Sequence, residues 1–326
     1  MHSDVQRRRQ RTEEVSEATG RALVGAPEAS AARPFGVRIA PSSLAALAAR
    51  FGGDAVSSEK DWSISVVAAP EGAGDLQGVL VPVYDARSVP AALEAVAHGA
   101  ALLVDPALSQ RFPDVASRWV HPFARWAAAK VLGAYGVPPA AAVVGRDVVL
   151  GAGVVLYPGV VLGDRVVIGA NSVLGAPGFG FVEGPSGPPL AIPHLAGLHI
   201  GNDVRIGALC TIDAGAFRAT EIGVGAALDA QVHVGHHARI GAGAILCAQS
   251  GLAGSVTIGA GAILGGQVGV ADHVTIGERA KIAAKSGVIG DVPAGETWGG
   301  YPAQPRLRWL RGIAASYRTS PRGGAA

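Results

Sequence analysis

Four histidines and one aspartate occupy a stretch of the chain that could support acid–base chemistry. His233, His236 and His237 lie in the segment QVHVGHHARIG, and His273 lies in VGVADHVTIG. Histidine can accept and return a proton near neutral pH, and a carboxylate on one ring nitrogen leaves the other nitrogen free to do so. Asp229 precedes the first of these segments. We therefore expect His236 to act as a general base and Asp229 to orient its ring.

A six-residue repeat must position these side chains. An aliphatic anchor followed by glycine or another small residue recurs every six positions from Val144, and the repeat is unbroken from Ile222 to Val288. This period fits short strands joined by tight corners, with the anchors pointing inward. Three hexads close a triangular coil, so we expect about seven stacked coils in a mainly β fold, a left-handed parallel β-helix. We expect the glycine to give each corner its unusual torsions.

Other roles for the histidines and the aspartate are open at this point. Asp229 could instead accept hydrogen bonds from the backbone of its own corner, as short carboxylates commonly do. Zinc is a second alternative, because imidazole is a common zinc ligand. His237 and His273 occupy equivalent positions two coils apart, about 9.6 Å by strand spacing. A zinc–nitrogen bond is about 2.1 Å, so these two histidines cannot share a metal within one chain.

The interruptions of the repeat divide the chain into segments. Residues 176–197 are rich in glycine and proline and should project as a loop, and extra residues at 216–219 should form a bulge. Loops on rigid scaffolds commonly carry binding function. The expected organisation is a flexible polar extension at 1–34, a small α/β domain at 35–137, the β-helix at 138–293 and a helical tail at 294–326.

Local patterns predict the elements of the α/β domain. A helix should begin near Ser42 or Ser43, because serine is a common helix N-cap. Apolar runs bounded by turn residues predict strands, and longer amphipathic runs predict helices. The expected strands are Ile64–Val67, Gly78–Val83 and Ala101–Val104, and the further helices are 89–99 and 121–136.

Composition narrows the function classes. The chain has 326 residues with 27 Lys and Arg against 25 Asp and Glu, a balance that gives no reason to expect nucleic-acid binding. No signal peptide or membrane-spanning stretch is visible, so we expect a cytoplasmic protein. Cys210 and Cys247 are too few for a disulfide framework and should be buried thiols. Neither a cysteine nor a serine is placed beside His236 as a nucleophile, which favours direct transfer.

Several segments of the coil resemble one enzyme family. The stretches GAPGFGF, IGNDVRIGALCTIDAGA, LDAQVHVGHHARIG, AQSGLAGSVTIG and LGGQVGVADHVTIG occur in the order typical of UDP-3-O-acylglucosamine N-acyltransferases of lipid A biosynthesis. The resemblance implies a homotrimer with active sites between adjacent coils. It implies an acyltransferase that moves a 3-hydroxyacyl group from acyl carrier protein to the 2-amino group of the UDP-linked sugar. The carrier thioester is then the donor, and no other cofactor is expected.

The resemblance also assigns roles to individual residues. His236 matches the general base of the family and Asp229 its orienting partner. Gly254 falls where a backbone N–H should face the thioester oxyanion, as a preorganised donor. The acyl chain should lie near Gln249, Gly266 and Gln267. The remaining substrate-binding positions that it implies are His273, Phe179, Phe181 and Tyr84.

Recognition positions depart from the family pattern and keep several functions open. The residue after the base is His237 instead of asparagine, and the motif at 189–194 of the projecting loop ends in His194 instead of glutamine. Alternatives are a related acyltransferase that acts on another nucleotide amino sugar or uses acyl-coenzyme A, and an inactive β-helix that binds a carrier protein or a glycan. A zinc enzyme similar to the γ-carbonic anhydrases is a third alternative.

Overall fold

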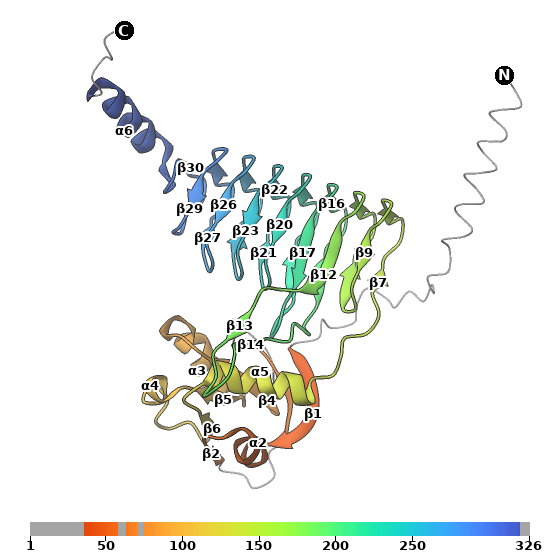
Figure 1. Cartoon of the computed structure of the whole chain (residues 1–326), viewed down its shortest axis with the longest axis vertical. Helices are drawn as coiled ribbons and strands as arrows, with labels where there is room; N and C mark the ends of the chain where they lie inside the picture. The colour runs from red at the N-terminus through yellow and green to blue at the C-terminus, as the bar shows by residue number, and fades with distance from the viewer. Residues whose placement is uncertain (1–35, 58–62, 71–74, 320–326) are drawn as a thin grey trace, which may run out of the picture. The chain divides into compact units, whose positions relative to one another are not determined.

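The structure, a computed structural model, describes residues 36–57, 63–70 and 75–319 (Figure 1). The expected polar extension, residues 1–34, lies outside the described residues. The described chain begins with an α/β unit, continues into a long coil of short strands and ends in a helix. Within the described residues, no helix is long and apolar enough to cross a membrane.

The repeat folds into a left-handed parallel β-helix with three sheets, as expected. Each complete coil contributes one strand to each sheet, and β30 and β31 extend one sheet after the last coil. We call the sheets the first, second and third face in the order in which the chain reaches them. The first face contains β7 (Val143–Val144), β10 (Val160–Leu162), β15 (Leu198–Ile200), β18 (Thr220–Ile222), β21 (Arg239–Ile240), β24 (Thr257–Ile258) and β27 (Thr275–Ile276). The second contains β8 (Val149–Leu150), β11 (Val167–Ile168), β16 (Arg205–Ile206), β19 (Ala227–Leu228), β22 (Ile245–Leu246), β25 (Ile263–Leu264), β28 (Lys281–Ile282), β30 (Thr297–Gly299) and β31 (Gln304–Pro305). The third contains β9 (Val155–Leu156), β12 (Val173–Pro177), β17 (Thr211–Ala214), β20 (His233–Val234), β23 (Gly251–Leu252), β26 (Gly269–Val270) and β29 (Gly287–Val288).

The inward anchors form a single apolar column inside the coil. Leu246, Leu264 and Ile276 are fully buried, and the small residues between successive anchors, such as Ala262, are buried with them. The first coil is the exception, since Val144 and its neighbours are partly exposed. Each coil covers only its neighbours, so the end coil leaves its own anchors uncovered.

The expected reason for the glycine after each anchor is wrong. The left-handed backbone conformation falls two residues later, for example at Gln231 and His237, both with φ of 60°. The glycine is required by close stacking instead. A Cβ on Gly241 would lie 2.5 Å from the backbone nitrogen of Ala260 in the next coil. A glycine at this position therefore lets the corners of adjacent coils touch.

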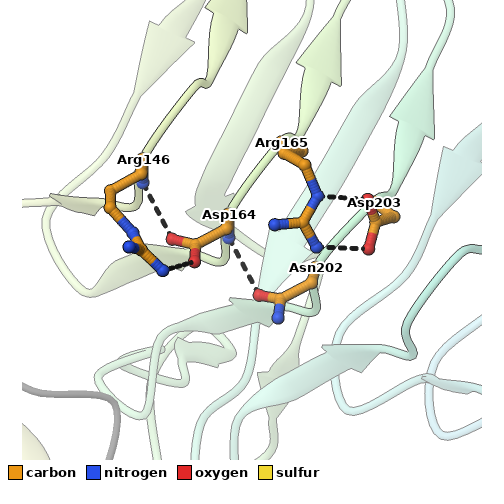
Figure 2. A network of polar contacts seen from close by, with 5 residues as sticks. All are labelled: Arg146, Asp164, Arg165, Asn202 and Asp203. Atoms are coloured by element: carbon orange, nitrogen blue, oxygen red, sulfur yellow. Dashed lines mark hydrogen bonds and ion pairs between the residues drawn. The ribbon is translucent and has the colours of Figure 1, made fainter.

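Charged side chains form a ladder at the corner between the first and second faces of the early coils (Figure 2). The carboxylate of Asp164 accepts hydrogen bonds from the backbone N–H and the guanidinium of Arg146, both at 2.8 Å. The backbone N–H of Asp164 donates to Asn202, and Arg165 pairs with both carboxylate oxygens of Asp203 at 2.7 Å. Exposed ion pairs add little stability, so the ladder mainly marks the regular spacing of the coils.

The α/β unit contains a six-stranded sheet with strand order β1-β3-β4-β5-β6-β2. Its elements are β1 (Val37–Ser43), α2 (Leu44–Phe51), β2 (Asp54–Ser57), β3 (Ser63–Val67), β4 (Val79–Val83), η1 (Ala86–Ser88), α3 (Val89–Ala97), β5 (Ala101–Val104), α4 (Pro106–Ser109), β6 (Ser117–Val120) and α5 (Ala124–Tyr135). Ser43 caps α2 as expected, by accepting from the backbone N–H of Ala46. The sequence did not predict β1, which lies at a sheet edge where its Pro41 is tolerated.

The projecting loop and the bulge pack against the α/β unit. The loop contains the hairpin of β13 (Phe181–Val182) and β14 (Leu190–Ala191), which reaches from the coil to α5 (Figure 1). Ile192 of the loop and Phe217 of the bulge join a buried cluster that includes Leu132 of α5. These apolar contacts fix the loop beside the coil.

The described chain ends in a helix. The tail forms α6 (Arg306–Thr319), a helix whose Leu307 is exposed.

The two cysteines differ in burial. Cys210 is buried as expected, but Cys247 is only half-buried, and both are free thiols. Cys247 lies at an outer corner position directly after its anchor, where the side chain faces away from the apolar column.

Because the corners stack closely, substitutions of two glycines should differ strongly in their effect on stability. Gly241→Ala should lower the free energy of unfolding by about 1–3 kcal/mol, because its Cβ must push neighbouring backbone apart. A Cβ on Gly290 would meet nothing within 4 Å, so Gly290→Ala should change the stability little. Denaturant unfolding of both variants measures the difference. Equal stability of the two would show that close stacking does not select the glycine.

Candidate functional site

The candidate site lies at the corner that leads from the third face to the first, which we call the histidine corner. It brings together His236, His237, Gly254 and His273, which follow β20, β23 and β26 in successive coils. Gly254 leaves room for the ring above it, since a Cβ there would lie 2.5 Å from Cε1 of His236. The structure therefore places His236 directly against Gly254, as a shared site requires.

An apolar groove of about 550 Å³ runs from the histidine corner along the third face. His236, Gly254 and Phe179 line one end of it, and Tyr301 lies near the other end. Its floor is formed by outward-facing glycines, and a Cβ on two of these would meet no atom within 4 Å. The floor glycines are Gly251, Gly269 and Gly287. Missing side chains thus create the channel.

The expected contact between Asp229 and His236 is wrong within one chain. Asp229 lies at the preceding corner, between the second and third faces, and its carboxylate accepts from the backbone N–H groups of Ala230 at 2.7 Å and Ala248 at 3.2 Å. This is the local backbone role left open by the sequence. The two residues are separated by one whole hexad and one position, so the repeat carries the chain past a full strand between them.

The positions expected for the acyl chain lie at the same corner as Asp229, which we call the glutamine corner. The side-chain amide of Gln249 donates to Gln231, and that of Gln267 donates to Gln249, each at 2.7 Å. None of these three residues lines the groove beside His236, and neither does Gly266. The expectation that the acyl chain lies near Gln249, Gly266 and Gln267 therefore stays a prediction, because these residues do not line the groove of the same chain.

His236 and His237 form a contact that fixes both rings. Nδ1 of His236 lies 3.0 Å from Nδ1 of His237. Nε2 of His237 accepts hydrogen bonds from the backbone N–H groups of Ala216 at 2.8 Å and Phe217 at 3.2 Å. The ring of Phe217 also stacks on His237 with a centroid separation of 6.2 Å. The bulge thus holds the histidine pair from one side.

Burial keeps the pair uncharged. Burial lowers the pKa of His236, and the positive charge of Arg125 lowers it further. Burial and the neighbouring His236 hold the pKa of His237 well below its usual range. Both rings are therefore neutral at neutral pH, where a neutral imidazole can exchange hydrogen bonds without bringing a charge into the site.

His194 is a site residue that sequence reasoning did not select. Its ring lies 5.1 Å from that of His236 and is 8% exposed. Burial lowers its pKa to about 4, with a smaller contribution from His236 in the same direction. Only the folding of the loop onto the coil brings it there; its sole signal in the sequence was the departure from the family pattern.

Asp213 and His233 form a second acid–base pair on the groove. Nε2 of His233 lies 4.0 Å from Oδ2 of Asp213, and its Nδ1 lies 2.7 Å from Oγ1 of Thr211. Burial raises the pKa of the Asp213 carboxyl to about 6, although His233 acts in the opposite direction. The histidine was noted in the sequence, but its partner follows only from the pairing of β17 with β20.

A second pocket, also about 550 Å³, lies between the α/β unit and the histidine corner. It is lined by Tyr84, Phe181 and His273, so three of the expected substrate-binding residues share this pocket and not the groove. The guanidinium of Arg125 lies 5.1 Å from the centre of the Tyr84 ring. Phe179 of the groove and Phe181 of the pocket are in edge-to-face contact at 5.0 Å. The two cavities therefore adjoin at the loop.

The zinc alternative requires several ligand side chains that converge on one point. In the part of the chain that the structure describes, no three His, Cys, Asp or Glu side chains form a group that could hold a metal ion. The imidazoles of the histidine corner contact each other and backbone groups instead.

The raised pKa of Asp213 predicts a pH-dependent stability. The folded state binds the Asp213 proton more tightly than the unfolded chain does, so this stabilisation is complete below pH 3.8 and is lost as the pH rises through about 6. Asp213→Asn should raise the free energy of unfolding by about 2 kcal/mol at pH 7.5. The two proteins should converge near pH 4 in denaturant titrations. A constant difference at both pH values would contradict the assignment.

Comparisons with known proteins agree with the architecture. Residues 141–176 match the family model of the bacterial transferase hexapeptide, six repeats. A UDP-3-O-acylglucosamine N-acyltransferase of Rhodopseudomonas palustris is 52% identical over 134 residues, which are 41% of this chain and 37% of the relative. One of Dechloromonas aromatica is 52% identical over 61 residues, 18% of this chain and 17% of the relative.

A solved UDP-N-acetylglucosamine acyltransferase from Campylobacter jejuni aligns with 58% of this chain and 85% of its own, at 22% identity and a TM-score of 0.43. This chain spans less than two fifths of the length of the two curated relatives, at 37% and 17%. The chain thus contains a hexapeptide repeat, which folds into a β-helix, and part of it is similar to UDP-3-O-acylglucosamine N-acyltransferases.

Proposed function

We propose that this protein is a cytoplasmic N-acyltransferase of lipid A biosynthesis. It moves a 3-hydroxyacyl group from acyl carrier protein to the 2-amino group of a UDP-3-O-acylglucosamine. One observation carries the proposal: the neutral ring of His236 lies where an apolar groove adjoins a second, more polar pocket. An acyl chain and a sugar nucleotide need such different surroundings, and their reacting ends must meet at one place.

The groove suits the acyl chain. Its glycine floor is open and its wall is apolar, which favours burial of a hydrocarbon chain. The thioester carbonyl would then lie at the end formed by His236 and Gly254, where a backbone N–H of Gly254 could donate to the developing oxyanion. The glutamine corner, which the sequence indicated for the acyl chain, does not line this groove of the same chain.

The second pocket suits a nucleotide sugar. Arg125 supplies a positive charge for a diphosphate, and Phe123 and Phe181 supply aromatic surfaces for a base. Two of the acidic residues at this pocket are already engaged, because Asp85 and Asp105 accept from backbone N–H groups at the starts of η1 and α4. Their charges are therefore partly satisfied within the protein.

The proposed acyl transfer needs no cofactor, because every bond and proton is accounted for by the two substrates. The amine nitrogen forms a bond to the thioester carbonyl carbon, the carbon–sulfur bond breaks, and one amine proton ends on the departing thiol. The exposed Arg306, Arg308 and Arg311 of α6 offer a basic surface to the acidic carrier protein. We include the carrier, and not coenzyme A, as the donor on that basis.

We also propose a homotrimer whose sites lie between subunits. Asp229 and the glutamine corner are separated from His236 of the same chain by the third face, so they are available to a neighbouring subunit. Three triangular coils packed side by side bring different corners of adjacent copies together. Asp229 would then complete the site of the adjacent subunit.

Removing His236 tests the activity. His236→Ala should lower turnover by at least about a hundredfold, because the side chain beside the reacting carbonyl is lost. Mass spectrometry of products, with a panel of acyl carrier proteins, acyl-coenzyme A and UDP-amino sugars, measures it. His98→Ala, an exposed histidine of the α/β unit, is the matched control. Near wild-type turnover of the His236 variant would disprove the role, and no product from wild type with any donor would favour an inactive binding protein.

Mixing two inactive variants tests the shared site. If each site combines His236 from one subunit with Asp229 from the next, co-expressed His236→Ala and Asp229→Ala chains should regain about a quarter of wild-type activity in randomly mixed trimers. Each variant alone should be inactive. Activity of the Asp229 variant by itself would show that this carboxylate only supports its own corner, and no recovery on mixing would contradict a site shared between subunits.

A further inference from the structure

We infer that His237 fixes the tautomer of His236 so that the proton of neutral His236 is on Nε2, which makes His236 a hydrogen-bond donor to the substrate. This inference rests on the proposed acyl transfer and specifies how that site works. It replaces the general-base role expected for His236. His237 is a positioning residue, since it acts through His236.

The contacts of His237 determine which of its ring nitrogens carries the proton. Two backbone N–H groups, those of Ala216 and Phe217, point at its Nε2 at 2.8 and 3.2 Å. A nitrogen that receives two donors must offer its lone pair and cannot carry a proton. A neutral imidazole carries one proton, so the proton of His237 is on Nδ1.

The proton on Nδ1 of His237 determines where His236 carries its own proton. Nδ1 of His237 faces Nδ1 of His236 at 3.0 Å, so the N–H of His237 donates and Nδ1 of His236 accepts. The single proton of neutral His236 is then on Nε2. The opposite arrangement would place an N–H on Nε2 of His237 against two further N–H groups, which is electrostatically unfavourable.

The structure holds His237 firmly enough to impose this choice. Its backbone N–H donates to the hydroxyl of Thr220 at 2.9 Å, and that threonine is fully buried. The Phe217 ring stacks on one side of the imidazole with an interplanar angle of 8°. A ring that is fixed at backbone and side chain cannot easily rotate to exchange its nitrogens.

The environment of His236 agrees with a proton on Nε2. A backbone hydrogen bond to Phe179 raises the pKa of His236, in opposition to burial and to Arg125 and His273. Nδ1 of His236 faces Nδ1 of His237, so Nε2 is the nitrogen on which the Phe179 backbone can favour a proton. Phe179 also lines the groove. A thioester carbonyl that enters the groove can therefore take over this donor.

The consequence for the reaction follows directly. A base must offer a free lone pair, and His236 has none while Nδ1 accepts from His237 and Nε2 is protonated. Its Nε2–H instead donates to the oxygen of the tetrahedral intermediate, together with the N–H of Gly254. The amine reacts in its uncharged form and its proton goes to the departing sulfur, so His236 keeps the same protonation state throughout.

Nitrogen NMR of the full-length protein with ¹⁵N-labelled histidine tests the tautomer without any activity. The His236 signals are assigned from their loss in His236→Gln. We expect a protonated Nε2 and an unprotonated Nδ1 at neutral pH. His237→Asp offers only acceptor oxygens and should invert the tautomer, whereas His233→Asn should leave it unchanged. A protonated Nδ1 in the wild type would overturn the inference, and so would an unchanged tautomer in folded His237→Asp; His237→Gln serves if that variant does not fold.

Kinetics separate a donor from a base. Glutamine retains an N–H donor but cannot take a proton, so His236→Gln should keep about tenfold to hundredfold more turnover than His236→Ala. Equal loss in both variants would contradict the donor role. If no acyl transfer is seen with the wild type, the proposed function fails, while the NMR result still decides the tautomer.

Discussion

The structure depends on the close approach of backbone between stacked corners. Each coil hydrogen-bonds to the next through two-residue strands, and where a glycine such as Gly241 follows the anchor, it is so near the next corner that a Cβ hardly fits. This contact keeps the repeat at 18 residues, as the pairing of Ile222 with Ile240 shows. A fixed repeat assigns every position to one face or one corner, and function follows from that assignment.

The three corners of the coil have different uses. The corner between the first and second faces holds charged pairs in the early coils, and the glutamine corner holds an amide ladder with the Asp229 carboxylate on backbone N–H groups. The histidine corner alone is interrupted by the loop and the bulge. These insertions bury the imidazoles, lower the pKa values of His194, His236 and His237, and add backbone donors that a regular corner lacks. The loop and the bulge thus form the candidate site on an otherwise regular coil.

The neutral histidines and the groove are linked physically. Burial makes charge costly at the corner, so a neutral hydrogen-bond network is the stable arrangement. Glycines line the groove beside His236, so no side chains fill it. An apolar channel that ends at a network of neutral donors is suited to stabilising a developing oxygen charge.

The sequence by itself determined the β-helix, its coils, the loop, the bulge and the chemically important histidines. A hexad is a local pattern whose anchors and small residues act on the nearest coils only, so periodicity is sufficient to predict it. The contact of Asp229 with His236 that the residue types indicated was wrong within one chain, because seven residues carry the chain beyond one corner. Tertiary structure decided the contacts of His194, the support of His237 by Ala216 and Phe217, and the placement of Tyr84 and Phe181 in a separate pocket. These contacts join segments that are remote in sequence and follow no period, so only the packing of the loop and the bulge against the α/β unit could bring them together.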